Sequence, residues 1–418
     1  MTARTGIGLL LGLCLGLSVV RGDFSCGTLA SKRTAITFWN GFTGPDGRVM
    51  LEMIRDFNRE NPDVEVTMQR IPWALYYNKV MVSGLDGRGP DVFVIHASAL
   101  TRMQRAGVLA PMDSLFESAI PADDFDPYVV EQTKFEGKRY CVPLDIHPQG
   151  MFLNKDMLRA AGLSAAPKNR EEFLRAAKMM KSSETFGFAL TAWQNNFMSL
   201  LPQFDGHYMG ADGKVDLDCP GNVEALEFLG SLKSKYDLIP PPDNQLGWVG
   251  YRQKKVGMVW DGIYMLGDLL RMEGMNYVGA PIPVIGKHAG TLADSHTLCF
   301  RPGMGATQRE ASERFVKYLS ANSLRWAGAG QVPARRSVRE TPEFKKMQVQ
   351  AAFAEQIPTM MYFPRIPVLF EMGIEVNLAV EKVIRGRATA KEALKSADEN
   401  TQMAMDRDAE QHKKVVTP

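Results

Sequence analysis

The sequence predicts an α/β protein with mostly parallel sheets, and three observations support this fold class. The chain has 418 residues, of which 45% are hydrophobic and 23% are charged, so it can bury the cores of two or three domains. Between residues 35 and 68, an apolar stretch, a stretch of helical period and an alternating stretch follow one another. Residues 91–95 then form a nearly continuous apolar run, typical of strands that a parallel sheet buries on both faces.

The N-terminal elements form a β-α-β unit. We predict a strand over residues 35–39, followed by a Gly-rich loop. From Met50 to Phe57 apolar residues recur at i, i+3, i+4 and i+7, which indicates a helix that ends before Pro62. Residues 64–68 alternate as a half-buried strand does, and a helix over 73–85 leads to the strand at 91–95.

The rest of the chain continues the alternation of strands and helices. A hairpin is expected to turn at Gly137, and an extended segment follows from Val142 to Pro148. Further helices are predicted over residues 155–161, 169–182, 222–235, 263–272 and 308–320, and again after residue 367. We find no internal repeat and no low-complexity linker.

The first residues are typical of a secretory leader. An apolar run from Ile7 to Val20 follows the single charge of Arg4, and it is shorter than the about 20 residues that a membrane-spanning helix needs. We therefore predict a signal peptide over residues 1–22 and a mature chain in the periplasm or at the extracytoplasmic face. Cys26 leaves a lipid anchor open, although the residues before it differ from the usual lipoprotein pattern.

Charge and cysteine content exclude several classes of protein. Arg4 and Arg21 lie in the leader, which leaves 47 basic residues against 47 acidic ones. A neutral chain of this kind argues against a nucleic-acid-binding protein. The five cysteines are too few for a disulfide framework and lack the paired spacing of a zinc site, although one disulfide stays open.

Short motifs along most of the chain resemble a known family. They are Phe38-Trp39-Asn40, Val64-Glu-Val66, Gly89-Pro-Asp-Val92, Gly137-Lys-Arg-Tyr-Cys-Val-Pro143, Leu153-Asn-Lys155, Lys255-Val-Gly-Met-Val-Trp-Asp-Gly262 and Gly330-Gln-Val-Pro-Ala-Arg335. In this order and at these intervals they resemble bacterial extracellular solute-binding protein family 1, the sugar-binding proteins of ABC importers. The chain departs from the family at Lys255-Val-Gly, where a Gly-Lys-x-Ala pattern is usual.

The resemblance implies a two-lobed periplasmic-binding-protein fold, type II-like, in which each lobe is a mostly parallel sheet flanked by helices. It places the N-terminal lobe at 35–144 plus 290–337 and the C-terminal lobe at 145–289 plus 338–418. The solute would lie in the cleft between the lobes, which would close by a hinge motion and present the closed form to the permease subunits of the ABC transporter. We expect a monomer that uses no cofactor.

The predicted binding residues combine aromatic rings with polar side chains. A carbohydrate or polyol needs flat rings against its C–H faces and carboxylates, amides or Arg for its hydroxyls. We expect such groups at the carboxyl ends of strands and where the chain crosses between lobes. The predicted substrate-binding residues are Trp39, Asn40, Phe42, Asp46, Asp145, His147, Trp193, Asn195, Asn196, Trp260, Asp261, Gly262, Tyr264, Arg335 and Tyr362.

Structural explanations stay open for several of these residues. A Trp near a strand end can fill a core, Asp261 can cap a helix, and Asn195 with Asn196 can form a turn. His147 can be a structural hydrogen-bonding residue, and Arg335 a solvated one.

No catalytic motif is found, so we predict no catalytic residue and no enzymatic activity. The six histidines show no metal-ligand spacing along the chain, so we also predict no metal site. Two alternatives remain open: a secreted carbohydrate-active α/β enzyme, and a sensory or structural derivative of the binding fold that binds no ligand. A phosphorylated glycerol derivative stays open as the ligand.

Overall fold

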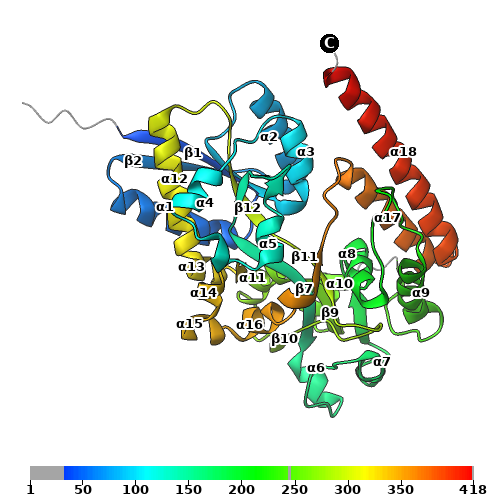
Figure 1. The fold of residues 1–418 in the computed structure, drawn as a ribbon. Helices are drawn as coiled ribbons and strands as arrows, with labels where there is room; N and C mark the ends of the chain where they lie inside the picture. Colours follow the sequence, from blue (N-terminus) through cyan, green and yellow to red (C-terminus); the bar gives the residue numbers. More distant parts are fainter. Residues whose placement is uncertain (1–32, 243–245, 417–418) are drawn as a thin grey trace, which may run out of the picture.

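The computed structural model describes residues 33–242 and 246–416, with side chains up to residue 411. The predicted signal peptide and Cys26 lie outside the described residues. Among the described helices, none combines the length and the apolar character needed to cross a bilayer. The described chain forms two α/β lobes, each built on its own sheet (Figure 1).

The first sheet has the strand order β2-β1-β3-β12-β6. Its strands are β1 (Thr34–Asn40), β2 (Val64–Arg70), β3 (Val92–His96), β6 (Cys141–Pro143) and β12 (His296–Phe300). β1 pairs in parallel with β2 and β3, as the β-α-β pattern predicts, while β12 runs antiparallel to β3 and β6. A small hairpin of β4 (Lys134–Phe135) and β5 (Lys138–Arg139) turns at Gly137, whose φ is 80°.

Apolar faces hold helices against the first sheet. The predicted apolar face of α1 (Asp46–Glu60) is confirmed, because its residues Met50, Met53, Ile54 and Phe57 are all buried. Other helices from this part of the chain are α2 (Trp73–Leu85), α3 (Leu100–Arg105), α4 (Asp113–Ser118), α5 (Pro127–Glu131), α12 (Ala306–Ala321) and α13 (Ser323–Ala327).

The second sheet has the order β14-β11-β7-β9-β8, with β10 and β13 also paired to β7. Its strands are β7 (Asp145–Asn154), β8 (Phe186–Leu190), β9 (Val256–Gly262), β10 (Tyr277–Ala280), β11 (Thr291–Asp294), β13 (Val332–Pro333) and β14 (Met360–Tyr362). Neither sheet of the described chain is mostly parallel as expected: the first has two parallel and two antiparallel pairings, and in the second β7 runs antiparallel to β9, β10, β11 and β13. β7 lies at the centre of this sheet, so its antiparallel pairings set the character of the whole sheet.

Helices cover the second sheet and extend to the C-terminus. They are α6 (Lys155–Ala160), α7 (Arg170–Met179), α8 (Trp193–Met198), α9 (Pro220–Ser234), α10 (Gly247–Arg252), α11 (Leu266–Leu269), α14 (Arg336–Arg339), α15 (Pro342–Lys345), α16 (Gln348–Ala354), α17 (Leu369–Ile384) and α18 (Ala390–Val416). α17 packs against α8, α9 and α18. The predicted helix at 263–272 is instead a 3₁₀ turn followed by the four residues of α11.

The chain crosses between the two sheets through a single residue at two neighbouring places, and a third, longer crossing runs from β12 through α12 and α13 to β13. β6 continues into β7 through Leu144, and β11 continues into β12 through Ser295. β7 and β11 pair there, with His147 opposite Asp294, and β12 places His296 opposite His96 of β3. The pairing therefore brings several polar side chains together between the lobes. The lobe boundaries themselves stay a prediction, although β11 belongs by pairing to the second sheet.

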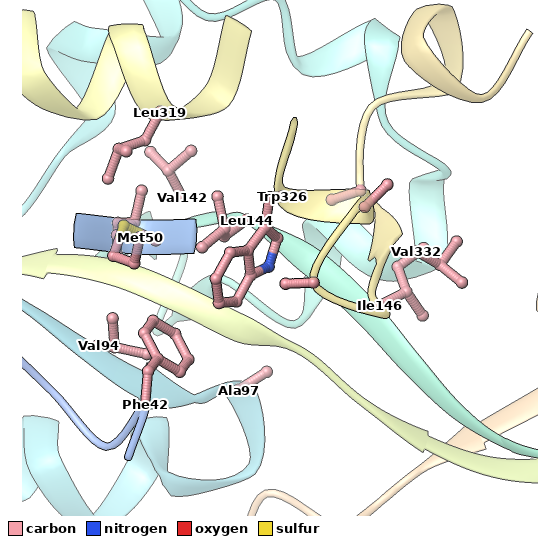
Figure 2. Packing of buried hydrophobic residues seen from close by; sticks show 14 of the residues in the cluster. Phe42, Met50, Val94, Ala97, Val142, Leu144, Ile146, Leu319, Trp326 and Val332 are labelled. Atoms are coloured by element: carbon pink, nitrogen blue, oxygen red, sulfur yellow. The ribbon is translucent and has the colours of Figure 1, made fainter. Parts of the chain in front are cut away.

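A buried aromatic cluster lies behind this crossing. Trp326 and Phe42 are both fully buried, with ring centroids 4.6 Å apart, and Figure 2 shows them packed together with Leu144 and Ile146 close by. The indole Nε1 of Trp326 donates a hydrogen bond to Asp145 Oδ2 at 2.6 Å. Through Asp145 this cluster also contacts His296, whose ring faces the space between the lobes.

Candidate ligand-binding site

A cavity of about 360 Å³ lies between the lobes at the crossing strands; we call it the inner cavity. The first lobe contributes the loop after β1, together with Trp73, His96 and His296. Strand β7 contributes His147 and Gln149. Asn195, Tyr264, Asp294 and Phe363 complete much of the remaining wall. Residues far apart in the sequence, from both lobes, thus enclose one space.

A second space, the outer cavity, has a volume of about 510 Å³ and shares His96 and Phe363 with the inner cavity. Tyr77 of α2 contributes from the first lobe. Most of the remaining wall comes from α17, where Phe370, Ile374 and Leu378 are 38%, 61% and 44% exposed. The two cavities form a continuous cleft with a polar inner part and an apolar outer part.

The aromatic rings of Trp73 and Tyr264 line the inner cavity, and each packs closely against a glycine. A Cβ on Gly41 would stand 2.1 Å from the Trp73 ring, and a Cβ on Gly262 would stand 2.0 Å from the Tyr264 ring. Each ring can therefore lie against bare backbone only because the neighbouring residue is glycine. Trp73 also stacks on His296, with ring centroids 5.7 Å apart and an interplanar angle of 15°.

Three histidines converge on the inner cavity. His96 ends β3, His147 lies on β7 and His296 begins β12. Their ring centroids are 4.6 to 5.4 Å apart, and His147 and His296 are 5% and 4% exposed. Burial lowers the pKa of His96 to about 4 and that of His296 to about 3, and it lowers the pKa of His147 as well. All three rings are therefore neutral at neutral pH.

The rings of His296 and His96 each make a hydrogen bond through Nδ1. Asp145 Oδ2 lies 2.8 Å from His296 Nδ1, and its Oδ1 accepts the backbone N–H of His296 at 2.8 Å. His96 Nδ1 shares a hydrogen bond with the Tyr77 hydroxyl. His147 differs, because its Nε2 is buried and has no hydrogen-bond partner among the residues that the structure describes.

Carboxylates and amides supply the other polar groups of the inner cavity. Asp294 accepts hydrogen bonds from the Ser98 hydroxyl and from the Ser295 backbone N–H, and Asp46 accepts one from Gly47 N–H. Burial raises the pKa of both carboxyls. With Gln149 and Asn195 on the second lobe, these groups can accept or donate hydrogen bonds to hydroxyls held between the rings.

Of the predicted binding residues, the structure brings Asp46, His147, Asn195 and Tyr264 together on the inner cavity wall. Gly262 and Asp145 do not line the cavity but contact residues that do: Gly262 packs against the Tyr264 ring, and Asp145 is hydrogen-bonded to His296. Asp261 is 5% exposed and its Oδ1 accepts the Gly262 N–H at 2.8 Å. Burial raises the pKa of Asp261 to about 6.

Trp260 does not lie at the cavity, which corrects the expectation that it stacks on a ligand. The side chain is fully buried in the core of the second lobe, with ring centroids 5.1 Å from Phe173 and 4.9 Å from Phe188. Asn196 is also fully buried, and its Nδ2 donates to the Trp260 carbonyl at 2.8 Å. Its amide completes the backbone hydrogen bonding at the end of β9, so it too is unavailable to a ligand.

The remaining predicted residues do not line either cavity and instead make contacts within the protein. Phe42 is buried beside Trp326, and the buried Asn40 accepts the Phe42 N–H at its Oδ1. Tyr362 is 3% exposed and its hydroxyl bonds Ser295 Oγ at 2.6 Å. Outside the walls of the two cavities, Trp39 packs under the Lys79 ammonium, Trp193 lines a small pocket with Pro240–Pro242, and Arg335 pairs with Asp124.

Trp73 is a weaker binding candidate from the sequence alone, and sequence analysis missed several other residues of the inner cavity: His96, Gln149, Asp294, His296 and Phe363. Strand pairing, not spacing along the chain, brings most of them together. Gly41 is the one local signal, since a glycine-rich loop directly after the first strand allows a bulky ring to approach its backbone.

Comparisons with known proteins agree with this architecture. Residues 43–320, more than half of the chain, match the family model for bacterial extracellular solute-binding proteins. The maltotriose-binding protein of Pyrococcus abyssi is 22% identical over 84% of this chain and 77% of its own length. The galactooligosaccharide-binding protein of Bacillus subtilis is 21% identical, over 88% of this chain and 89% of its own.

A solved structure shares the fold. The ABC substrate-binding protein of Listeria monocytogenes in complex with cycloalternan superposes with a TM-score of 0.79 at 20% identity, over 90% of this chain and all of the other. The family match, the two lobes and the cavity between them lead to one conclusion. The chain belongs to the bacterial extracellular solute-binding proteins.

Proposed function

We propose that this protein is the extracytoplasmic solute-binding component of an ABC importer and that it captures a carbohydrate or polyol in the inner cavity. The observation that carries the proposal is the wall itself, in which the rings of Trp73 and Tyr264 alternate with Asp46, Asn195 and Gln149. Flat apolar rings suit the C–H faces of a sugar, and the carboxylate and amides suit its hydroxyls.

The origin of these groups supports binding by lobe closure. Asp46 and Trp73 come from the first lobe, whereas Asn195 and Tyr264 come from the second. A solute that touches both walls is bound more tightly when the lobes approach each other, so it favours the closed state. Hinge motion would be localised at Leu144 and Ser295, each a single residue between strands of different sheets, and at the third crossing that precedes β13.

The relatives support an uncharged sugar as the solute. The two curated relatives are named for maltotriose and galactooligosaccharides, and the solved structure contains cycloalternan. The outer cavity extends the cleft beyond the inner cavity and offers room for further sugar units. We further propose that the protein acts as a monomer, delivers the solute unchanged, and presents its closed form to permease subunits.

Calorimetric titration of the purified protein with mono- and oligosaccharides and polyols tests the proposal. We expect at least one sugar to bind at micromolar Kd, about 8 kcal/mol, and to make the particle more compact in small-angle scattering. Trp73→Ala should weaken that binding at least tenfold. Trp193→Ala is the matched control, because this Trp lies in a separate pocket, and it should leave Kd unchanged.

Two results would contradict the proposal. One is that no sugar or polyol raises the melting temperature or binds in calorimetry. The other is that Trp73→Ala and Trp193→Ala weaken binding equally. Chromatography of the sugars after incubation addresses the enzyme alternative, since a binding protein returns them unaltered.

A further inference from the structure

The three histidines of the inner cavity are arranged as a set of metal ligands, although they are far apart in the sequence. One nitrogen of each of the rings of His96, His147 and His296 lies within 4.8 Å of one nitrogen of each of the other two. Nitrogens bound to one tetrahedral zinc ion lie about 3.3 Å apart, as follows from Zn–N distances of about 2.0–2.1 Å. The nitrogens would therefore have to approach one another by at most about 1.5 Å to bind one ion.

Hydrogen bonds at Nδ1 leave Nε2 as the ligand atom of His296 and His96, and the unpaired Nε2 of His147 is the candidate on the third ring. The Nδ1 atoms of His296 and His96 are already engaged by Asp145 and by the Tyr77 hydroxyl. Metal-binding histidines characteristically use one nitrogen for the ion and the other for an oxygen atom behind the ring, which orients the ring. Asp145, which bonds His296, also accepts a hydrogen bond from Trp326 Nε1 at 2.6 Å, and this bond helps to orient the carboxylate.

An unpaired atom gives independent support. His147 is 5% exposed, and its Nε2 has no hydrogen-bond partner among the described residues. A buried polar atom without a partner is destabilising, so its retention needs an explanation. A metal ion between the rings would give this nitrogen its partner.

We propose that His96, His147 and His296 bind one divalent transition-metal ion of the zinc class through their Nε2 atoms, with one coordination position open to the inner cavity. Neutral imidazoles suit zinc, copper and nickel, whereas magnesium and calcium prefer oxygen ligands. Three protein ligands with one open position are typical of sites where the ion contacts a water or a solute. The open position would accept an oxygen atom of the solute or a water.

A second group of potential ligands, His207, Asp216 and Cys219, is less suited to the role. His207 Nε2 is already paired with Asp216 Oδ2 at 2.7 Å, and these two side chains are 44% and 38% exposed. The group thus has a local salt-bridge explanation and no unpaired buried atom. It provides the comparison for the experiment.

The test uses protein purified without a histidine tag and stripped of metal with a chelator. Cobalt(II) serves as the spectroscopic probe, because tetrahedral coordination gives intense visible absorption, and zinc(II) is titrated by calorimetry. We expect one ion per chain. His147→Gln should weaken zinc binding by at least 100-fold without changing the melting temperature of the metal-free protein, since the replaced Nε2 makes no hydrogen bond.

His96→Gln should weaken zinc binding to the same extent and keeps the test valid if His147→Gln fails to fold, although its melting temperature can fall because it loses the hydrogen bond to Tyr77. His207→Gln and His288→Gln are the controls, and both should bind zinc as the unaltered protein does. Substoichiometric binding, retention of affinity in both His96→Gln and His147→Gln, or loss of affinity in His207→Gln would overturn the proposal.

The metal site does not depend on the proposed transport function. Sugar titrations with and without one equivalent of zinc separate the two. Metal binding without any sugar binding would contradict the sugar proposal alone, and sugar binding without stoichiometric metal would contradict the metal proposal alone.

Discussion

Trp260 and Tyr264 lie four residues apart at the end of β9, yet they occupy different environments. Trp260 is fully buried between Phe173 and Phe188, whereas Tyr264 is 37% exposed on the inner cavity wall. Both have polar or glycine neighbours, so local sequence does not distinguish them. Trp260 lies within β9 and pairs with Met151 and Leu190, but Tyr264 comes after the carboxyl end of the strand, where α/β sheets place their ligands.

The largest expected effect is a loss of stability, and it tests whether Trp260 belongs to the core. Trp260→Ala removes a fully buried indole and should lower the free energy of unfolding by about 3–5 kcal/mol, as large-to-small core substitutions do. Denaturant titration measures the change. Trp260→Phe keeps most of the packing and should keep sugar affinity unchanged. If Trp260→Phe instead abolished sugar binding while leaving stability intact, the assignment of this residue to the core would be wrong.

The elements of the first lobe could be predicted from the sequence because their signals are local. The apolar spacing of Met50 to Phe57 and the run at 91–95 each report burial of one element by periodicity alone. The mixed character of the second sheet could not be predicted this way. Strand direction depends on which strands pair with β7, and pairing is a property of residues distant in sequence.

The predicted residues that reach the site come soon after a strand or lie at the crossing: Asp46 after β1, Asn195 after β8, Tyr264 after β9 and His147 on β7. The histidine cluster was not predictable, because it depends on the register that sets His96 opposite His296 and His147 opposite Asp294. The error at Trp260 has the same cause. A one-residue step along a strand reverses the face of the side chain, and the sequence does not say which face is covered.

The second prediction concerns Asp261, which lies between the two aromatic residues. Burial raises its pKa from 3.8 to about 6, so the folded protein holds this proton more tightly than the unfolded chain does. Stability contributed by this carboxyl is therefore lost as pH rises from about 4 to about 6, and the ionised group costs about 3 kcal/mol at pH 7. Asp261→Asn removes that cost and keeps an oxygen for the Gly262 N–H.

Asp261→Asn should thus be more stable than the unaltered protein at pH 7, by at most about 3 kcal/mol, and equally stable near pH 4. Denaturant midpoints measured across this range check the result. The other buried carboxyls, Asp46, Asp145 and Asp294, are present in both proteins and cancel in the difference. A stability difference that does not vary with pH would show that Asp261 titrates normally.

The third prediction tests the ligand side of the comparison and rests on the proposed sugar binding. Tyr264→Ala should weaken sugar affinity about tenfold, about 1.4 kcal/mol, because it removes a ring that stacks on the sugar. Its effect on the melting temperature should be small, since the ring is partly exposed. Tyr236→Ala is the control, because Tyr236 is also 37% exposed but lies away from the cavity wall. Equal affinities for the two variants would contradict the assignment of Tyr264.

The smallest expected effect separates the inner from the outer cavity. Ile374 is 61% exposed on α17 and lines the outer cavity, so a solute confined to the inner cavity does not reach it. Ile374→Ala should leave the Kd of a monosaccharide unchanged and raise that of a longer oligosaccharide about twofold, the effect of losing about 0.4 kcal/mol of apolar contact. Leu85→Ala, at a 69% exposed position outside both cavity walls, should change neither. An equal loss for short and long sugars would mean that α17 acts on closure of the lobes and not through contact with the solute.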